Sequence, residues 1–203
     1  MSGPALAGVV LCVNGGQRAA VEGTWSASLE WLVGRLAPRF PRLRFAELRY
    51  RIKSWEHLDS CIDDARAALR ELDAGRTLLV GFSMGGAVSS VVADEPSVQG
   101  VVGIAPWLPH QLPLDALAGK RLRVLHGSLD RALPGIPGVS SASSHAGFER
   151  ALRAGAHGEY TLIRGAVHGL ALRAPWGRPL PLPRAAAWAR LIADELARFE
   201  STS

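Results

Sequence analysis

One stretch, residues 77–93, constrains the fold of this chain more than any other. An apolar, β-branched run at 77–80 stops at Gly-Phe-Ser-Met-Gly (81–85), and a run suited to a helix follows, from Ala87 to about Ala93. This pattern predicts a strand, a sharp turn carrying Ser83, and a helix. Side chains at positions 81 and 85 would clash in so tight a turn, which explains the two glycines, and Ser83 is forced toward a positive φ.

A serine in such a turn stands clear of the strand end, where its hydroxyl is open to other groups. The next amide, that of Met84, points into the same space. The alternative is an ordinary glycine-rich turn of an α/β protein, since G-x-S-x-G often occurs by chance. The strand before the turn and the helix after it favour a nucleophilic Ser83.

The rest of the chain alternates between runs typical of buried strands and runs with a helical spacing of apolar residues. The expected strands are 7–13, 43–48, 77–82, 98–105, 122–125 and 160–163, and the expected helices are 25–36, 58–72, 87–93, 144–155 and 185–199. Thr24 is the expected cap of the first helix, and Gly75 the expected end of the second. The alternation predicts an α/β fold: a doubly wound, mostly parallel sheet of about six strands with helices on both faces.

The length of the chain predicts a single domain over residues 1–203. We find no internal repeat and no polar linker, and 203 residues are enough to bury one sound core. The connection between the fourth and fifth expected strands, residues 106–121, is too short to hold an inserted lid domain.

Through the residues Gly-Phe-Ser-Met-Gly (81–85), the chain resembles the α/β-hydrolase superfamily, and the small lidless esterases and dienelactone-hydrolase-like members are the most similar. The resemblance implies a minimal version of that fold, without its two leading strands. It implies the sheet order 2-1-3-4-5-6 for the six expected strands. It also implies a Ser–acid–His triad in that order along the chain.

His168 is the candidate base. It follows the last expected strand, in a loop flanked by Gly165 and Gly169, and this loop emerges at the carboxyl edge of the sheet. The chain has six histidines, and a solvated surface residue is the alternative for any one of them. Position and chain order favour His168, because a serine nucleophile needs a histidine to take its proton.

Asp130 is the candidate acid that orients His168, because it follows the fifth expected strand by a few residues. An aspartate that merely caps a turn is the alternative. Asp115 and Glu149 fall outside the strand-end position and rank lower. The resemblance makes His-Gly-x-x-Asp (126–130) the acid loop, in which His126 supports the turn.

The oxyanion that forms during acyl transfer needs preorganised N–H donors. The amide of Met84 is one candidate. The loop 14–17 should supply the other, from Gly16, which we favour, or from Gln17. Many members of the superfamily carry His-Gly in this loop, whereas this chain has Asn14-Gly15. The change keeps the backbone donor, although a plain tight turn is the alternative for these glycines.

Together these residues predict a serine hydrolase that cleaves a small carboxylic ester or thioester through an acyl-enzyme intermediate. Trp107, Trp176 and Leu170 lie in segments near the expected mouth of the site and are the candidate substrate-binding residues. Two alternatives stay open. One is an acyltransferase with the same triad, and the other is a catalytically silent hydrolase scaffold that acts as a small-molecule receptor or interaction module.

Composition argues against several other classes of function. The net charge is +5, but the arginines are scattered and no basic–aromatic stripe exists, so we expect no nucleic-acid partner. No run is long and apolar enough for a transmembrane helix and no signal peptide is apparent, so we expect a cytoplasmic protein without a membrane partner. The glycine spacings fit neither a phosphate loop nor a dinucleotide fingerprint, and metal-ligand spacings are absent, so we expect no cofactor and no metal.

Overall fold

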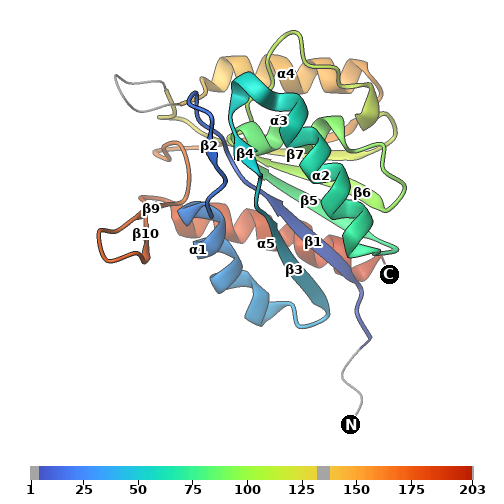
Figure 1. The fold of residues 1–203 in the computed structure, drawn as a ribbon, viewed down its shortest axis with the longest axis horizontal. Coiled ribbons are helices and arrows are strands. Elements are labelled where there is room, and N and C mark those ends of the chain that lie inside the picture. Colours follow the sequence, from blue (N-terminus) through green and yellow to red (C-terminus); the bar gives the residue numbers. More distant parts are fainter. Residues whose placement is uncertain (1–4, 132–137, 203) are drawn as a thin grey trace.

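A parallel sheet of six strands forms the centre of the computed structural model, which describes residues 5–131 and 138–202 (Figure 1). The strands are β1 (Gly8–Val13), β3 (Leu43–Leu48), β5 (Thr77–Phe82), β6 (Val98–Ile104), β7 (Arg121–Gly127) and β8 (His157–Ile163). Their order across the sheet is β3-β1-β5-β6-β7-β8, and every neighbouring pair is parallel. Counted as main strands this order is 2-1-3-4-5-6, so the predicted fold class and strand order are confirmed.

Helices cover both faces of the sheet (Figure 1). The helices α1 (Ala27–Leu36) and α5 (Ala185–Ser201) pack on one face, and α2 (Leu58–Leu72), α3 (Met84–Val91) and α4 (Ser141–Arg153) pack on the other. The core under α1 and α5 includes the fully buried Trp188, and the core on the opposite face includes Leu79 and Phe148. Because both faces are covered, strands such as β1 and β5 are buried along almost their whole length and carry continuous apolar sequence.

Shorter elements lie in the connections. The strand β2 (Val21–Glu22) pairs antiparallel with β4 (Ile52–Lys53), and β9 (Ala171–Arg173) pairs antiparallel with β10 (Pro179–Pro181). Short 3-10 helices occur at η1 (Ala37–Arg39), η2 (Trp55–His57) and η3 (Asp115–Leu117). None of the described helices is long and apolar enough to cross a membrane.

Two predicted helix caps are wrong by two residues, although the predicted range of the second helix, 58–72, is confirmed. Ser26 rather than Thr24 caps α1, because the Ser26 side chain accepts a hydrogen bond from an amide of the first turn, while the Thr24 hydroxyl binds the ammonium of Lys53 at 2.5 Å. The C-cap of α2 is Asp73 rather than Gly75. Asp73 takes the left-handed conformation, with a φ of 41°, which aspartate tolerates better than most residues do.

Candidate active site

Ser83 lies in a sharp turn between β5 and α3, at the carboxyl edge of the sheet. Its φ is 54°, a left-handed conformation that serine rarely adopts. Hydrogen bonds hold the turn in place. The amide of Ser83 donates to the carbonyl of Ile104, and its carbonyl accepts from the amide of Trp107, each at 2.9 Å. The strained residue is thereby fixed to β6 and to the loop that follows it.

Close packing around the turn explains the glycines on both sides of Ser83. A Cβ atom at Gly81 would overlap the carbonyl oxygen of Gly85, and a Cβ atom at Gly85 would overlap the carbonyl oxygen of Val13. These obstacles are backbone atoms, which cannot move aside as the end of a side chain can. The strands β1 and β5 and the helix α3 therefore meet this closely only with glycine at both positions.

Asp130 and His168 meet from two different loops at the same edge of the sheet. Asp130 follows β7 and His168 follows β8. Nδ1 of His168 lies 2.7 Å from Oδ2 of Asp130, a distance typical of a charge-assisted hydrogen bond. The aspartate side chain is fully buried, whereas the imidazole is 16% exposed. The bond to Asp130 orients the ring through Nδ1 and leaves Nε2 for another group.

The carboxylate of Asp130 has two further neighbours. The amide of Val139 donates to Oδ1 at 3.1 Å, and Nε2 of the fully buried His126 lies 3.1 Å from Oδ2 and 2.9 Å from the carbonyl oxygen of Val139. Burial by itself would raise the pKa of Asp130. The hydrogen bonds from His126 and His168 outweigh burial and hold the pKa below its ordinary value. Asp130 therefore stays ionised, which is the form that orients a histidine and stabilises its protonated state.

His168 lies beside the turn that carries Ser83. Its ring centroid is 5.1 Å from the ring centroid of Phe82, and a Cβ atom at Gly169 would come within 3.2 Å of the Phe82 ring. In the part of the chain that the structure describes, no hydrogen bond joins His168 to the Ser83 hydroxyl. The three predicted residues thus lie in one region of the sheet edge. Asp130 and His168 are hydrogen-bonded there, whereas His168 and Ser83 are not.

The loop 14–17 packs directly on the same turn. A Cβ atom at Gly15 would lie 3.4 Å from Cβ of Ser83, and one at Gly16 would overlap Sδ of Met84. Met84 begins α3, so its amide has no acceptor within the helix. Gln17 lies one residue further on, and its carbonyl accepts from the first amide of η2 at 3.1 Å. The two segments expected to supply oxyanion donors are therefore in contact beside the serine.

Asn14 holds this loop in place, a role that the sequence alone did not indicate. Its side-chain amide donates to the carbonyl of Leu48 (2.6 Å), and its side-chain oxygen accepts from the amide of Ser26 (3.0 Å). Its own carbonyl accepts from the hydroxyl of Tyr50 (3.0 Å). Asn14 is 1% exposed, so these bonds satisfy a buried amide. The only signal in the sequence is one polar residue at the end of an apolar strand, which is equally typical of a turn.

A cavity of about 180 Å³ adjoins the turn. Its lining residues are Trp55, Ser83, Met84, Trp107, Gly138 and Val139. Trp107 therefore lies where it was expected, on the loop after β6. Trp55 comes from η2 and was not predicted, because only the tertiary fold brings it to the carboxyl edge. Two indole rings and a valine make this a site suited to a small apolar group.

No family model matches this sequence, and no curated protein sequence matches it either. Solved structures match it over nearly its whole length. MGS-M1, an α/β hydrolase enzyme from a Medee basin deep-sea metagenome library, superposes with a TM-score of 0.70 at 20% identity, over 96% of this chain and 85% of the other. An α-β serine hydrolase homologue from Coxiella burnetii gives a TM-score of 0.70 at 16% identity, over 96% and 87% of the two chains. Est1E from Butyrivibrio proteoclasticus gives 0.70 at 10% identity, over 98% and 90%. The chain has the α/β-hydrolase fold.

Two residues that were expected to bind substrate do not reach the cavity. Leu170 is fully buried in the core under α1 and α5, because the chain turns at Gly169, with a φ of 94°, and directs the next side chain inward. Trp176 lies between β9 and β10, is 69% exposed and does not line this cavity. Both residues follow the candidate base closely in sequence, yet neither lines the cavity beside Ser83.

The described residues of this α/β-hydrolase fold contain no group of three or more His, Cys, Asp or Glu side chains placed to hold a metal ion.

Proposed function

We propose that this chain is a serine hydrolase that cleaves small carboxylic esters or thioesters through an acyl-enzyme intermediate. The observation that carries the proposal is the 2.7 Å contact between Asp130 and His168, next to the strained turn of Ser83. Neither feature favours folding, because a buried carboxylate loses hydration and a serine at positive φ costs roughly 1–3 kcal/mol. Their coincidence at the edge where α/β sheets bind ligands supports a catalytic role.

In the proposed mechanism, Ser83 attacks the carbonyl carbon while Nε2 of His168 takes the hydroxyl proton. Asp130 holds Nδ1 of His168 and stabilises the imidazolium. The amide of Met84 and one amide from the loop 14–17 bind the oxyanion. His168 then protonates the leaving alcohol or thiol, and water hydrolyses the acyl-enzyme through the same steps.

The substrate should carry a short acyl group. The cavity beside Ser83 is small, at about 180 Å³, and its walls are mainly apolar. Each buried methylene adds about 0.8 kcal/mol of binding, and this gain stops where the cavity ends. We therefore propose an optimum at roughly two to six acyl carbons.

A silent scaffold that acts as a receptor or interaction module is the second candidate. One observation favours it: within the described residues, Ser83 makes no hydrogen bond to His168. Catalytic hydrogen bonds are often long without substrate and tighten when it binds. The formed Asp130–His168 pair therefore weighs more than the absent serine contact.

We also propose a cytoplasmic location. Cys12 and Cys61 are both free and buried. Thiols that stay reduced are typical of proteins in a reducing compartment.

Rapid-mixing kinetics with p-nitrophenyl acetate test the proposed hydrolase. An acyl-enzyme predicts a burst of about one p-nitrophenolate per chain, followed by slower steady turnover. A panel of p-nitrophenyl esters of increasing acyl length, with matched thioesters, then locates the optimum. Turnover no faster than in buffer alone, for every member of both series, would favour the receptor instead.

A further inference from the structure

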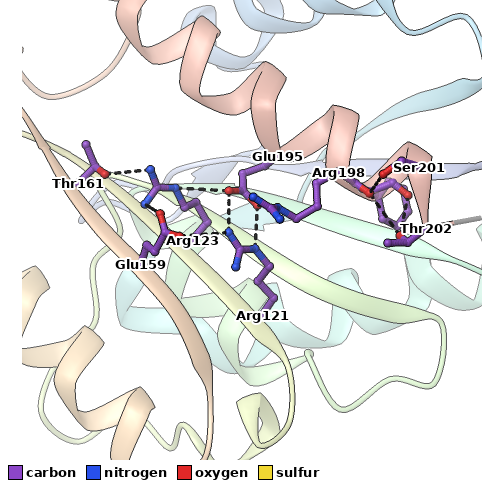
Figure 2. A network of polar contacts seen from close by, with 9 residues as sticks. Arg121, Arg123, Glu159, Thr161, Glu195, Arg198, Ser201 and Thr202 are labelled. Carbon is purple, nitrogen blue, oxygen red and sulfur yellow. Dashed lines mark hydrogen bonds and ion pairs between the residues drawn. The ribbon is translucent and has the colours of Figure 1, made fainter.

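A dense group of charged side chains lies at the opposite edge of the sheet, where the parallel strands begin (Figure 2). Arg121 and Arg123 extend from β7 toward α5, which carries Glu195 and Arg198. Glu159 approaches the two β7 arginines from the neighbouring strand β8. This group, which we call the β7–α5 arginine cluster, has no part in the chemistry proposed above, because the candidate active site lies at the other end of the strands.

Glu195 is the carboxylate on which three guanidinium groups of the cluster converge. Arg121 binds it with Nε and Nη2, each at 2.9 Å, while Nε of Arg123 lies 3.5 Å away and Nε of Arg198 lies 3.7 Å away. Its side chain is 8% exposed. Burial tends to raise the pKa of Glu195, but the bond from Arg121 and the charges of its neighbours hold the pKa below its ordinary value. Glu195 is thus one negative charge shared among three positive ones.

Arg123 is buried, with a side chain 8% exposed. Its Nη2 donates to the hydroxyl of Thr161 at 2.9 Å, and its Nη1 lies 3.1 Å from a carboxylate oxygen of Glu159. Glu159 is 62% exposed, so water weakens this ion pair. Among the described residues, Nε and Nη1 of Arg123 make no hydrogen bond of good geometry. These two atoms are buried and contact acceptors only through the ion pairs with Glu195 and Glu159, so charge rather than hydrogen bonding offsets much of the cost of burying this guanidinium.

A cavity of about 290 Å³ opens beside the cluster. Its walls include Arg76, Arg121, Arg123, Glu195, Arg198 and Thr202. The three arginines of the cluster share two carboxylates, which leaves a formal surplus of one positive charge. In the ranges 5–131 and 138–202, Nη1 of Arg121 and both Nη atoms of Arg198 make no hydrogen bond. Arg76 adds a fourth guanidinium to the wall, where it donates to the carbonyl of Phe199 at 3.1 Å.

An ion-pair network that only joins α5 to the sheet does not need these features. One bidentate pair, Arg121 with Glu195, would suffice for that purpose. Arg121, Arg123 and Arg198 instead line a common cavity, so the surplus charge lies beside it. The Nη atoms of Arg121 and Arg198 that make no hydrogen bond within the described residues are the donors left for an anionic group with several acceptor oxygens.

We propose that this cavity binds a small molecule through a phosphate group. A phosphate offers three strong acceptor oxygens, and the planar fork of a guanidinium matches them in pairs. A carboxylate has two oxygens and a single charge, so it would leave donors of the cluster unused. The volume of the cavity is close to the lower end of small-molecule sites, which leaves room for an organic group beside the phosphate.

Isothermal titration calorimetry on the full chain tests the site, with inorganic phosphate as the first probe and chloride at matched ionic strength as the reference. We expect saturable binding of phosphate at pH 7.5. Arg198→Gln should weaken this binding by about fivefold or more, because it removes the exposed cation with unused donors. Glu159→Gln should strengthen it by about twofold or more, because it raises the positive surplus.

Arg190→Gln is the matched control, since Arg190 is exposed on the same helix and does not line the cavity. Its affinity for phosphate should stay within about twofold of the unmodified protein. The phosphate group could belong to a phosphate ester or be free phosphate. Ribose 5-phosphate distinguishes the two, with ribose as the control that lacks the phosphate. Tighter binding than inorganic phosphate assigns a phosphate ester as the ligand, and equal or weaker binding assigns free phosphate. Two results would contradict the proposed site. One is that phosphate shows no saturable binding, and the other is that Arg190→Gln and Arg198→Gln weaken phosphate binding equally.

Discussion

Three groups converge on the carboxylate of Asp130, and this convergence sets what the residue can do. His168 and the amide of Val139 bind different oxygens, and the buried His126 stands 3.1 Å from Oδ2. The resulting fall in the pKa of Asp130 favours its ionised form, which is the form present at neutral pH. These contacts fix the orientation of the Asp130 carboxylate. Its hydrogen bond to Nδ1 in turn fixes the orientation of the His168 ring.

Replacing Asp130 by asparagine should therefore reduce kcat for an ester by roughly 10³- to 10⁴-fold. The amide can present an N–H to Nδ1 of His168, which favours the wrong tautomer. Asp115→Asn is the control, because Asp115 is an exposed aspartate outside the site. Steady-state kinetics on p-nitrophenyl acetate compare the two variants. A nearly full kcat in Asp130→Asn, or an equal loss in Asp115→Asn, would transfer the role of acid to another carboxylate.

Trp55 is the residue we expect to limit acyl length, because it lines the cavity beside Ser83. Trp55→Ala should move the best acyl chain to a length greater by about two carbons or more, since each added methylene then finds apolar space. Trp176→Ala removes an indole that is 69% exposed and outside the cavity, so it should leave the optimum unchanged. The readout is kcat/KM over the ester panel. A shift in Trp176→Ala without one in Trp55→Ala would place the acyl group at the β9–β10 hairpin.

At the scale of the element, the unit β5–turn–α3 depends on close backbone contact with β1. Gly85→Ala should lower the free energy of unfolding by about 2 kcal/mol or more, because the added Cβ meets the backbone carbonyl of Val13. Gly34→Ala, in the exposed part of α1 where a Cβ meets nothing within 4 Å, should raise it by about 0.5–1 kcal/mol. Urea unfolding measures both. Equal stability in the two variants would mean that the turn is not packed as described.

The elements that could be predicted are those whose sequence pattern is set mainly by the burial of apolar side chains. Buried apolar runs such as 8–13 and 77–82 are typical of strands covered on both faces, so the sheet followed from the sequence pattern. The strand order came from the resemblance to the α/β hydrolases, because the pattern of each run does not say which strands are neighbours. The β9–β10 ribbon escaped prediction because Pro179 and Pro181 argue against a strand, although proline is tolerated in an edge strand. In the site, Ser83, Asp130 and His168 each follow a strand, which is a local signal. Trp55 reaches the cavity only through tertiary contacts, which leave no such signal.

At the scale of the whole molecule, α5 is joined to the sheet by a carboxylate that must stay charged. Glu195→Gln should lower the free energy of unfolding by about 3 kcal/mol at pH 7, because it removes a negative charge that offsets the positive charge of the buried Arg123. The pKa of Glu195 is lowered by folding. Its ionised form therefore stabilises the fold above the unfolded pKa of about 4.3, and this contribution is lost as the pH falls through the folded value.

The difference between the unmodified protein and Glu195→Gln should thus be full at pH 6 and shrink as the pH falls below about 4. Urea unfolding at both pH values measures it. Glu71→Gln is the control, since Glu71 is exposed and makes no ion pair within the described residues, and its effect should stay within about 0.5 kcal/mol. A difference that grows toward low pH would contradict the assigned charge of Glu195.

The central claim is that Ser83 is an activated nucleophile, and covalent labelling tests it most directly. Purified protein is incubated with a fluorophosphonate, and intact-protein and peptide mass spectrometry count and locate the adducts. We expect one adduct per chain, on Ser83, because a fluorophosphonate reacts with a serine hydroxyl that a neighbouring base activates. Ser83→Ala should abolish labelling with little loss of stability, whereas Ser143→Ala, which removes an exposed hydroxyl on α4, should leave it unchanged. An unlabelled protein that is otherwise folded, or an adduct that persists in Ser83→Ala, would contradict the claim.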